Sequence, residues 1–187
     1  YYLTSQSTQH ASYVDGIHEL RRLSHSSRVE NPANRSRLFD ALFDAAHRCR
    51  ILTVVRRGKF GAQWINDRIA AGLRAHLDPG SNPDSGLFSG ALIMVTRNDY
   101  ARGLFNGDVG VVVRYPDDGF YQAYFRRSGG YVAFPVSGLP NWELAFAMTV
   151  HKSQGSEFEN TLLLLPADPQ HRLLTREIVY TAATRAS

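Results

Sequence analysis

The side chains best suited to chemistry gather in one polar string that follows an apolar run. After Ala147-Met148 the chain reads Thr149-Val150-His151-Lys152-Ser153-Gln154-Gly155-Ser156-Glu157. The hydroxyl, imidazole and ammonium groups in it suit phosphate and sugar contacts, and they belong to Thr149, His151, Lys152 and Ser153. Gly155 would let a ligand approach the backbone closely, and the Glu157 carboxylate could accept a ribose hydroxyl. Open α/β sheets bind ligands beyond the carboxyl ends of their strands, so the string is a candidate ligand site.

The same string also fits an ordinary turn from a strand into a helix. In that interpretation Ser153 or Ser156 caps the helix, and Glu157 compensates the helix dipole in the first turn. Both interpretations stay open at the level of this string alone.

A second string contains an arginine beside a helical packing stripe. It reads Arg176-Glu177-Ile178-Val179-Tyr180-Thr181-Ala182-Ala183-Thr184-Arg185-Ala186. Apolar residues recur every four positions and predict one buried helix face: Leu174, Ile178, Ala182 and Ala186. Arg185 lies next to this face. An arginine near a domain interface can reach the γ-phosphate of a nucleotide held by a neighbouring domain. The alternative is an ordinary surface or ion-pairing arginine.

The sequence gives little support for a hydrolase triad, a metal site or a phosphate-binding loop. His151, Ser153 and Glu157 lie within seven residues of one another, without the G-x-S-x-G turn of a hydrolase nucleophile. The seven histidines and the single Cys49 show no metal-ligand spacing, so we expect no metal site. Gly58-Lys59 is followed by Phe60 and is no phosphate-binding loop, because the G-x-x-x-x-G-K-S/T pattern does not occur.

The elements that would position these strings alternate between strands and helices. We predict helices over 37–48, 62–77 and 175–186, and buried strands over 51–55, 142–150 and 160–165. A helix that follows a buried strand is half of a parallel α/β unit, so the fold class is α/β with a parallel sheet.

The middle of the chain has a different pattern. Short β-type runs over 91–96, 109–115, 120–126 and 131–136 are separated by hairpin signals, among them Asn106-Gly107 and Ser128-Gly129-Gly130. They predict a small inserted barrel. Its candidate nucleic-acid contacts are Arg97, Arg102, Arg126 and Arg127, with Tyr100 and Tyr124 for base stacking.

We therefore expect four segments. Residues 1–37 are a peripheral polar segment of uncertain order, in which Tyr13, Ile17 and Leu20 could line a short helix. Residues 38–86 and 140–187 form the α/β domain, and residues 87–139 form the inserted barrel.

Composition sets broad limits. The 187 residues carry a net charge of +4 and are 43% hydrophobic, which is enough for one sizeable core with a small insertion and is compatible with nucleic acid. One cysteine permits no internal disulfide, and no long apolar run or leader is evident, so we expect a cytoplasmic protein without membrane contact. The chain begins at Tyr1, and we expect it to be a fragment.

Together the two strings, in this order, resemble motifs V and VI of superfamily 1 helicases. The similarity is closest to RecD, the alpha subunit of the exodeoxyribonuclease V (RecBCD) helicase-nuclease. Further similar stretches are Arg57-Gly58-Lys59-Phe60-Gly61 through Asn66, Arg97-Asn98-Asp99, and Gly103 through Gly110. The resemblance extends from about Leu38 to the last residue, where the family continues with another strand.

The resemblance implies a RecA-like second motor domain with an inserted Src-homology-like β-barrel. It implies part of an ATP-dependent 5′–3′ DNA helicase that acts in double-strand break repair and recombination. Single-stranded DNA would meet Thr149, His151, Lys152 and Ser153. Gly155 and Glu157 would face ATP, and Arg185 would stabilise charge on the γ-phosphate.

The same resemblance implies that ATP and Mg²⁺ are held mainly by a first motor domain that this chain lacks. We therefore expect the isolated chain to be inactive. The other expected partners are the remaining subunits of a RecBCD-type complex. The alternative function is a non-enzymatic module that binds DNA or protein through the barrel.

Overall fold

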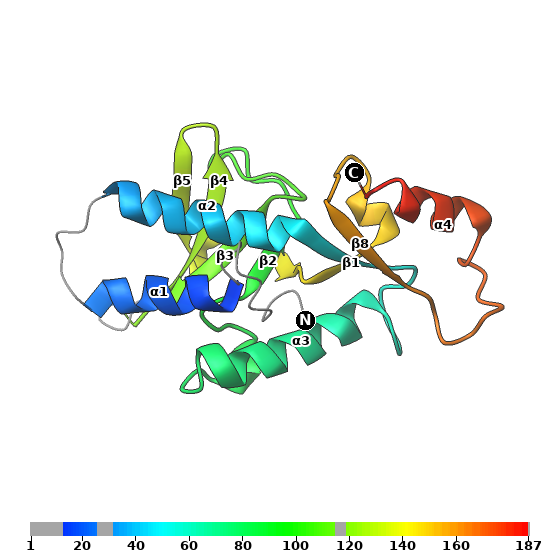
Figure 1. The fold of residues 1–187 in the computed structure, drawn as a ribbon, viewed down its shortest axis with the longest axis horizontal. Helices are drawn as coiled ribbons and strands as arrows, with labels where there is room; N and C mark the ends of the chain where they lie inside the picture. The colour runs from blue at the N-terminus through cyan, green and yellow to red at the C-terminus, as the bar shows by residue number, and fades with distance from the viewer. Residues whose placement is uncertain (1–12, 26–31, 115–118, 187) are drawn as a thin grey trace. The chain divides into compact units, whose positions relative to one another are not determined.

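The computed structural model describes residues 13–25, 32–114 and 119–186 (Figure 1). Its contacts divide the chain into two compact units. The parallel-sheet unit comprises residues 47–69 and 144–187, and the antiparallel-sheet unit comprises residues 1–46 and 70–143. Within the described ranges, no helix is both long and apolar enough to span a bilayer.

The parallel-sheet unit is built on three strands in the order β7-β1-β8. The central strand β1 (Cys49–Thr53) pairs in parallel with β7 (Ala147–Thr149) and with β8 (Asn160–Leu164). The prediction of a parallel α/β arrangement is confirmed. The edge strand β8 is apolar in sequence, yet its Leu162 side chain is 51% exposed.

Helix α3 (Ala62–Leu77) follows β1, with the same bounds that the apolar spacing predicts. The loop before it is closed by backbone bonds, since the Ala62 amide donates to the Val55 carbonyl over 3.0 Å. Ala62 and Ile65 are buried in the first turns, as expected for the face that packs beside the strand.

The prediction of one strand over residues 142–150 is wrong. The segment contains two strands in different sheets: β6 (Trp142–Leu144) and β7. Between them lie Ala145 and Phe146, both buried. The mostly apolar residues of this segment cannot show such a break, because the hydrogen-bonding partners that decide it are distant in sequence.

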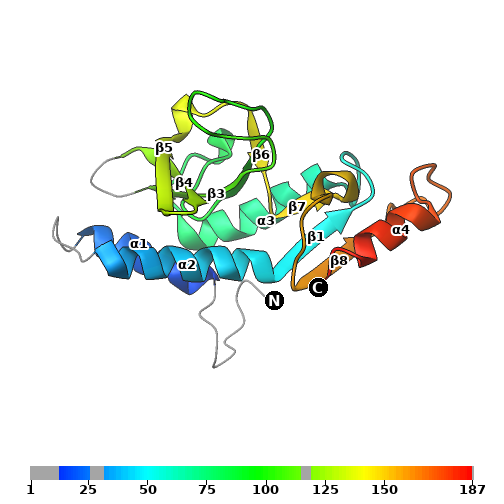
Figure 2. The same ribbon diagram turned by 90° about the horizontal axis from the view of Figure 1, so that it is seen from above.

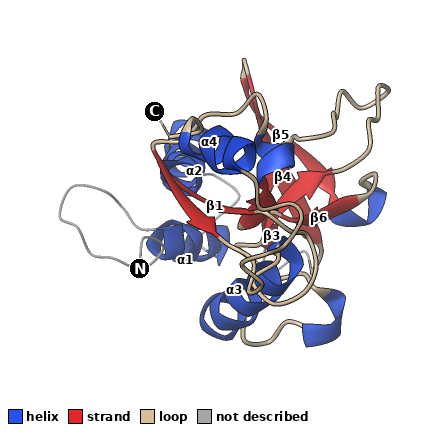
Figure 3. Ribbon diagram, turned by 90° about the vertical axis from the view of Figure 1, so that its right-hand side faces the viewer, coloured by secondary structure: helices blue, strands red, loops and turns tan. Residues whose placement is uncertain are grey.

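The antiparallel-sheet unit contains a five-stranded sheet in the order β5-β4-β3-β2-β6. Strands are red in Figure 3, where β3, β4, β5 and β6 of this sheet are labelled. Its first four strands are β2 (Leu92–Val95), β3 (Val109–Arg114), β4 (Tyr121–Arg127) and β5 (Gly130–Pro135). Successive pairs from β2 to β5 are antiparallel, which confirms the run of short strands. Closure of this sheet into a barrel stays a prediction.

Two helices belong to the same unit, α1 (Tyr13–His25) and α2 (Pro32–Arg48, of which the last two residues fall in the parallel-sheet unit). They run side by side (Figures 1 and 2), and a Cβ on Gly16 would come within 2.7 Å of Leu42. The predicted face of Tyr13, Ile17 and Leu20 is buried, so α1 is a core element, which the expectation of a peripheral segment did not anticipate. Residues 1–12 and 26–31 lie outside the described part.

Helix α2 packs against the hairpin of β4 and β5. The Phe39 ring stacks on Tyr124 at a centroid distance of 4.4 Å, and the Tyr131 hydroxyl donates to the Asp40 carboxylate. Burial, together with that hydrogen bond, raises the pKa of Tyr131 to about 12. Arg126 completes the junction with an ion pair to Asp44 at 2.8 Å.

The remaining elements are short. They comprise the 3-10 turns η1 (Pro83–Ser85), η2 (Val136–Gly138) and η3 (Val150–Ser153), and the eight-residue helix α4 (Arg176–Ala183).

Candidate nucleotide and nucleic-acid site

The three parallel strands end at one edge of their sheet. Thr53 of β1 is in register with Thr149 of β7 and with Leu164 of β8. The segments that follow these strands therefore leave from the same edge, which is where ligands bind in open α/β sheets. The first polar string, predicted as a ligand site, follows β7 at this edge.

That string begins as the 3-10 turn η3 rather than as a helix. Val150 is fully buried and anchors the turn, while His151 and Lys152 are exposed and Thr149 is half-buried. An imidazole and an ammonium group are thus presented to solvent by a turn with a buried anchor.

Ser153 is placed differently from the other predicted DNA contacts. Its side chain is fully buried, and its hydroxyl donates to the Val150 carbonyl over 2.8 Å. The hydroxyl closes the turn from within and is not presented to a ligand. Ser153 is therefore excluded from the contact set that we propose below. It does not cap a helix either, because η3 is followed by extended backbone at Gln154.

Gly155 adopts a left-handed backbone conformation, with φ at +83°. No atom lies within 4 Å of where a Cβ would be, so space is not the constraint at this position. The requirement for glycine comes from the backbone angle, which L residues rarely adopt. The turn leaves Gly155 and Glu157 exposed, as the predicted nucleotide contacts must be.

Arg185 lies just beyond the end of α4, and not within it as predicted. The helix begins at its cap Thr175, whose hydroxyl accepts from the Ile178 amide over 3.3 Å, and it ends at Ala183. Of the predicted packing stripe only Ala182 is fully buried. The stripe is less buried than the four-residue spacing indicated.

The two strings are in direct contact. The Arg185 guanidinium donates from Nη1 to the Ser156 carbonyl over 3.3 Å and from Nε to the Thr181 carbonyl over 3.2 Å. The Phe158 amide in turn donates to the Arg185 carbonyl over 2.8 Å. These bonds place Arg185 beside the turn that carries Gly155 and Glu157.

Two buried polar residues support β7, and the sequence pattern did not single out either for this role. The Asn66 amide donates to the carbonyls of Leu144 and Ala147 over 2.8 and 2.9 Å, and its oxygen accepts from the Ala147 amide over 2.8 Å. Arg50 donates to the Ala145 carbonyl, and its guanidinium lies 5.1 Å from the centre of the Phe158 ring. Two sequence features could have pointed to these residues. Arg50 is an arginine inside an apolar strand, and Asn66 is an asparagine inside an amphipathic helix.

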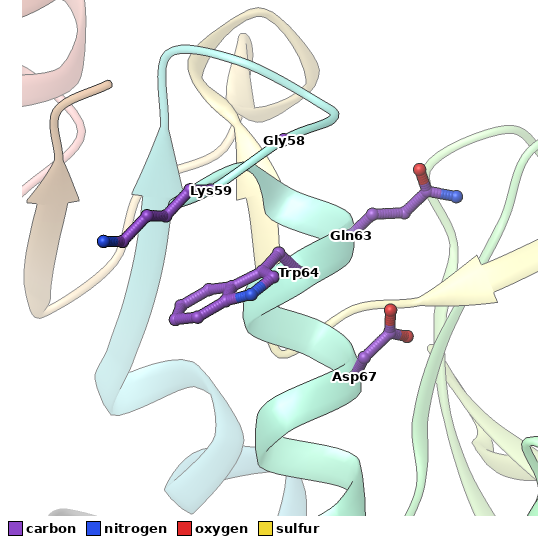
Figure 4. Close-up of a pocket in the computed structure, with 5 residues that line it drawn as sticks. All are labelled: Gly58, Lys59, Gln63, Trp64 and Asp67. Atoms are coloured by element: carbon purple, nitrogen blue, oxygen red, sulfur yellow. The ribbon is translucent and has the colours of Figure 1, made fainter. Parts of the chain in front are cut away.

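A basic loop joins β1 to α3 at the same sheet edge. Arg56, Arg57 and Lys59 are exposed, and Phe60 adopts a positive φ of 66°, the only non-glycine residue to do so in the described part of the chain. A shallow hollow is lined by Gly58, Lys59, Gln63, Trp64 and Asp67 (Figure 4). Lys59 and Trp64 project on one side of the start of α3, whereas Gln63 and Asp67 project on the other (Figure 4).

The site has no features of a metal centre. Across the ranges that the structure describes, no three His, Cys, Asp or Glu side chains are grouped so that they could hold an ion. Cys49 is a half-buried free thiol whose pKa is raised by burial.

Two comparisons found helicases among the proteins that this chain resembles. Residues 144–187, which contain both strings, match the UvrD-like helicase C-terminal domain. Among solved structures, Pif1 helicase from Bacteroides in complex with ADP-AlF3 and single-stranded DNA is similar, with 17% identity and a TM-score of 0.46, covering 98% of this chain and 49% of that one.

The particular family follows from curated relatives. RecBCD enzyme subunit RecD of Mycolicibacterium smegmatis is 36% identical over 182 residues, which is 95% of this chain and 31% of that protein. RecD of Haemophilus influenzae is 35% identical over 73% of this chain and 20% of its own length. The ATP-dependent RecD2 DNA helicase of Deinococcus radiodurans is 31% identical over 73% of this chain and 19% of its own length.

The chain therefore belongs to the RecD-type superfamily 1 helicases and corresponds to part of their C-terminal region. It spans less than a third of the length of the relatives described above.

Proposed function

We propose that this chain is the second motor domain of an ATP-dependent 5′–3′ DNA helicase of the RecD type. The observation that carries the proposal is the contact between the Arg185 guanidinium and the Ser156 carbonyl. It joins the segment that leaves the carboxyl end of β7, which suits DNA and sugar contacts, to the arginine suited to a γ-phosphate.

The residues divide into two roles. Thr149, His151 and Lys152 meet the backbone of single-stranded DNA, where an exposed ammonium and imidazole neutralise phosphates. Gly155 and Glu157 face the nucleotide sugar, and Arg185 stabilises charge that develops on the γ-phosphate.

ATP and Mg²⁺ are held mainly by a first motor domain. Bound nucleotide supplies the energy of the cycle, and this chain contributes an arginine and a DNA surface to a shared site. The RecA-like part comprises residues 38–86 and 140–187, and strands β2 to β5 belong to the inserted barrel of residues 87–139. The whole protein works in the cytoplasm in double-strand break repair and recombination, beside the other subunits of a RecBCD-type complex.

The isolated chain should show only background phosphate release, with or without single-stranded DNA. It carries no phosphate-binding loop, and its described part holds no cluster of acidic side chains for Mg²⁺. A phosphate-release assay on the purified chain, with the full-length parent as positive control, measures this. DNA-stimulated turnover by the chain alone would show that the half-site assignment is wrong.

Lys152→Ala should weaken binding of single-stranded DNA and flatten its salt dependence. Loss of one phosphate contact lowers the slope of log K against log salt by about 0.7. Anisotropy titrations of a labelled oligonucleotide at several salt concentrations give the slope. Arg37→Ala is the matched control, because Arg37 is an exposed cation on α2 outside the site, and its removal should leave the slope unchanged. An unaltered slope for Lys152→Ala would remove Lys152 from the DNA surface.

A further inference from the structure

The loop between β2 and β3 presents two large aromatic side chains to solvent. Tyr100 is 78% exposed and Phe105 is 48% exposed. Their rings form an edge-to-face pair with centroids 6.1 Å apart and planes at 73°. The loop thus displays a paired aromatic surface within the antiparallel-sheet unit.

The backbone beneath these rings is held in place by hydrogen bonds. The Asp99 and Leu104 backbones pair in both directions, over 2.7 and 3.0 Å, and the Leu104 side chain is fully buried. The Asn98 carboxamide accepts from the Asn106 amide over 2.7 Å and donates to the Tyr100 hydroxyl over 3.0 Å. One of the two rings is therefore fixed directly by a neighbouring side chain.

The Phe105 side of the loop is anchored independently. The Asp108 carboxylate accepts from the Phe105 amide over 2.9 Å and from the Arg127 guanidinium over 2.7 Å. The same guanidinium donates to the Gly103 carbonyl over 3.0 Å. A loop ordered before binding loses less conformational entropy when a ligand arrives, so exposed rings on it are efficient contacts.

The charges of the loop favour an anionic ligand. Its two carboxylates are both engaged by arginines, Asp99 by Arg102 at 2.6 Å and Asp108 by Arg127. Hydrogen bonding to Arg102 holds the pKa of Asp99 below its usual range. Arg97 is exposed and forms no ion pair with any residue that the structure describes, so its positive charge is available.

We propose that the loop of residues 97–108 binds single-stranded nucleic acid, with bases stacked on Tyr100 and Phe105 and a phosphate at Arg97. Aromatic faces beside a cation are the combination that proteins use to hold single strands without sequence preference. The inference rests on the proposed function for the class of ligand, and it adds a second contact surface outside the parallel-sheet unit.

The other side chains of the sheet that the sequence suggested as nucleic-acid contacts are engaged within the protein. Tyr124 is buried against Phe39, and Arg126 and Arg127 are engaged in ion pairs with aspartates. These side chains are parts of the packing. Tyr100 and Arg97 remain from the set that the sequence suggested, and Phe105 is new.

Base stacking predicts a loss of affinity on truncation of either ring. Tyr100→Ala and Phe105→Ala should each weaken binding of a labelled oligothymidylate to the full chain by roughly 5- to 150-fold, from the known contribution of one stacked base. Tyr100→Phe keeps the ring and should bind within about twofold of wild type, since only the hydroxyl is lost. Phe120→Ala is the matched control, because Phe120 is 75% exposed but lies outside the loop.

An oligonucleotide of the same length with abasic sites tests the mechanism. Wild type, Tyr100→Ala and Phe105→Ala should bind it equally, because no base remains to stack. Equal losses on normal and abasic DNA would overturn the stacking proposal, as would wild-type affinity of both alanine variants.

If Lys152→Ala weakens binding while the ring variants do not, the loop inference fails and the proposed function stands. If the wild-type chain binds no single-stranded DNA at low salt, both fail. Thermal midpoints of all variants should match, since these rings are exposed.

Discussion

Arg185→Ala in the full-length parent should reduce DNA-stimulated ATP hydrolysis by roughly 10³- to 10⁵-fold, the range of arginine fingers. Its guanidinium matters most when charge develops on the γ-phosphate, so nucleotide affinity should fall far less. Lys at this position should rescue poorly, because its single nitrogen cannot reproduce the planar guanidinium, which reaches the Ser156 and Thr181 carbonyls from two different nitrogens and keeps further N–H groups for a phosphate. Steady-state hydrolysis with and without DNA, and nucleotide titrations, measure the two effects.

The structure adds a second consequence of this substitution. Two side-chain hydrogen bonds to backbone carbonyls are lost, and each typically contributes about 1 kcal/mol, so a modest decrease in the thermal midpoint should accompany the loss of rate. Arg176→Ala is the matched control, because Arg176 is an exposed arginine in the first turn of α4, the helix that precedes Arg185. If Arg185→Ala unfolds the domain while the surviving molecules hydrolyse ATP normally, the arginine is structural.

Asp78→Asn should give the largest loss of stability among single substitutions of charged residues. The Asp78 carboxylate is 1% exposed and pairs with Arg114 at 2.6 Å and with Arg21 at 3.6 Å. It also accepts from the Ser89 amide over 3.0 Å and from the Tyr121 hydroxyl over 3.3 Å. Burial and the Asp78 charge raise the pKa of Tyr121.

Breaking a buried pair leaves its partners without compensation and typically costs about 3–5 kcal/mol. We expect the lower end, about 3 kcal/mol, because Arg21 and Arg114 remain 27% and 28% exposed. Denaturant unfolding of the chain measures the difference. Asp44→Asn breaks the exposed pair with Arg126 and should cost no more than about 1 kcal/mol. Equal effects of the two substitutions would contradict a buried anchor at Asp78.

The local sequence pattern was sufficient to predict those helices and strands whose conformation is determined by their own residues. Helix α3 has the predicted bounds because its apolar residues recur at helical spacing between a glycine-containing loop and Asp78-Pro79-Gly80. The strands from β2 to β5 lie within a residue or two of the β-branched and aromatic runs that predicted them. The first polar string was visible because its side chains are unusual at the end of an apolar strand.

Tertiary contacts decided the features that the local pattern could not predict. Residues 142–149 divide between two sheets because Asn66 and Arg50, distant in sequence, bind the backbone from Leu144 to Ala147. Ser153 is turned inward by the packing of η3, although its residue type alone suited a DNA contact.

What the sequence by itself determined was therefore the family, the parallel α/β class and the residues of the two strings. Only the tertiary structure decided that the strings touch, through Arg185 and the Ser156 carbonyl. It also decided which side chains of the antiparallel-sheet unit remain available, since Tyr124 is buried and Tyr100 is exposed. The physical reason is that periodicity reports which face of an element is apolar, whereas burial and hydrogen bonding depend on partners brought together only by folding.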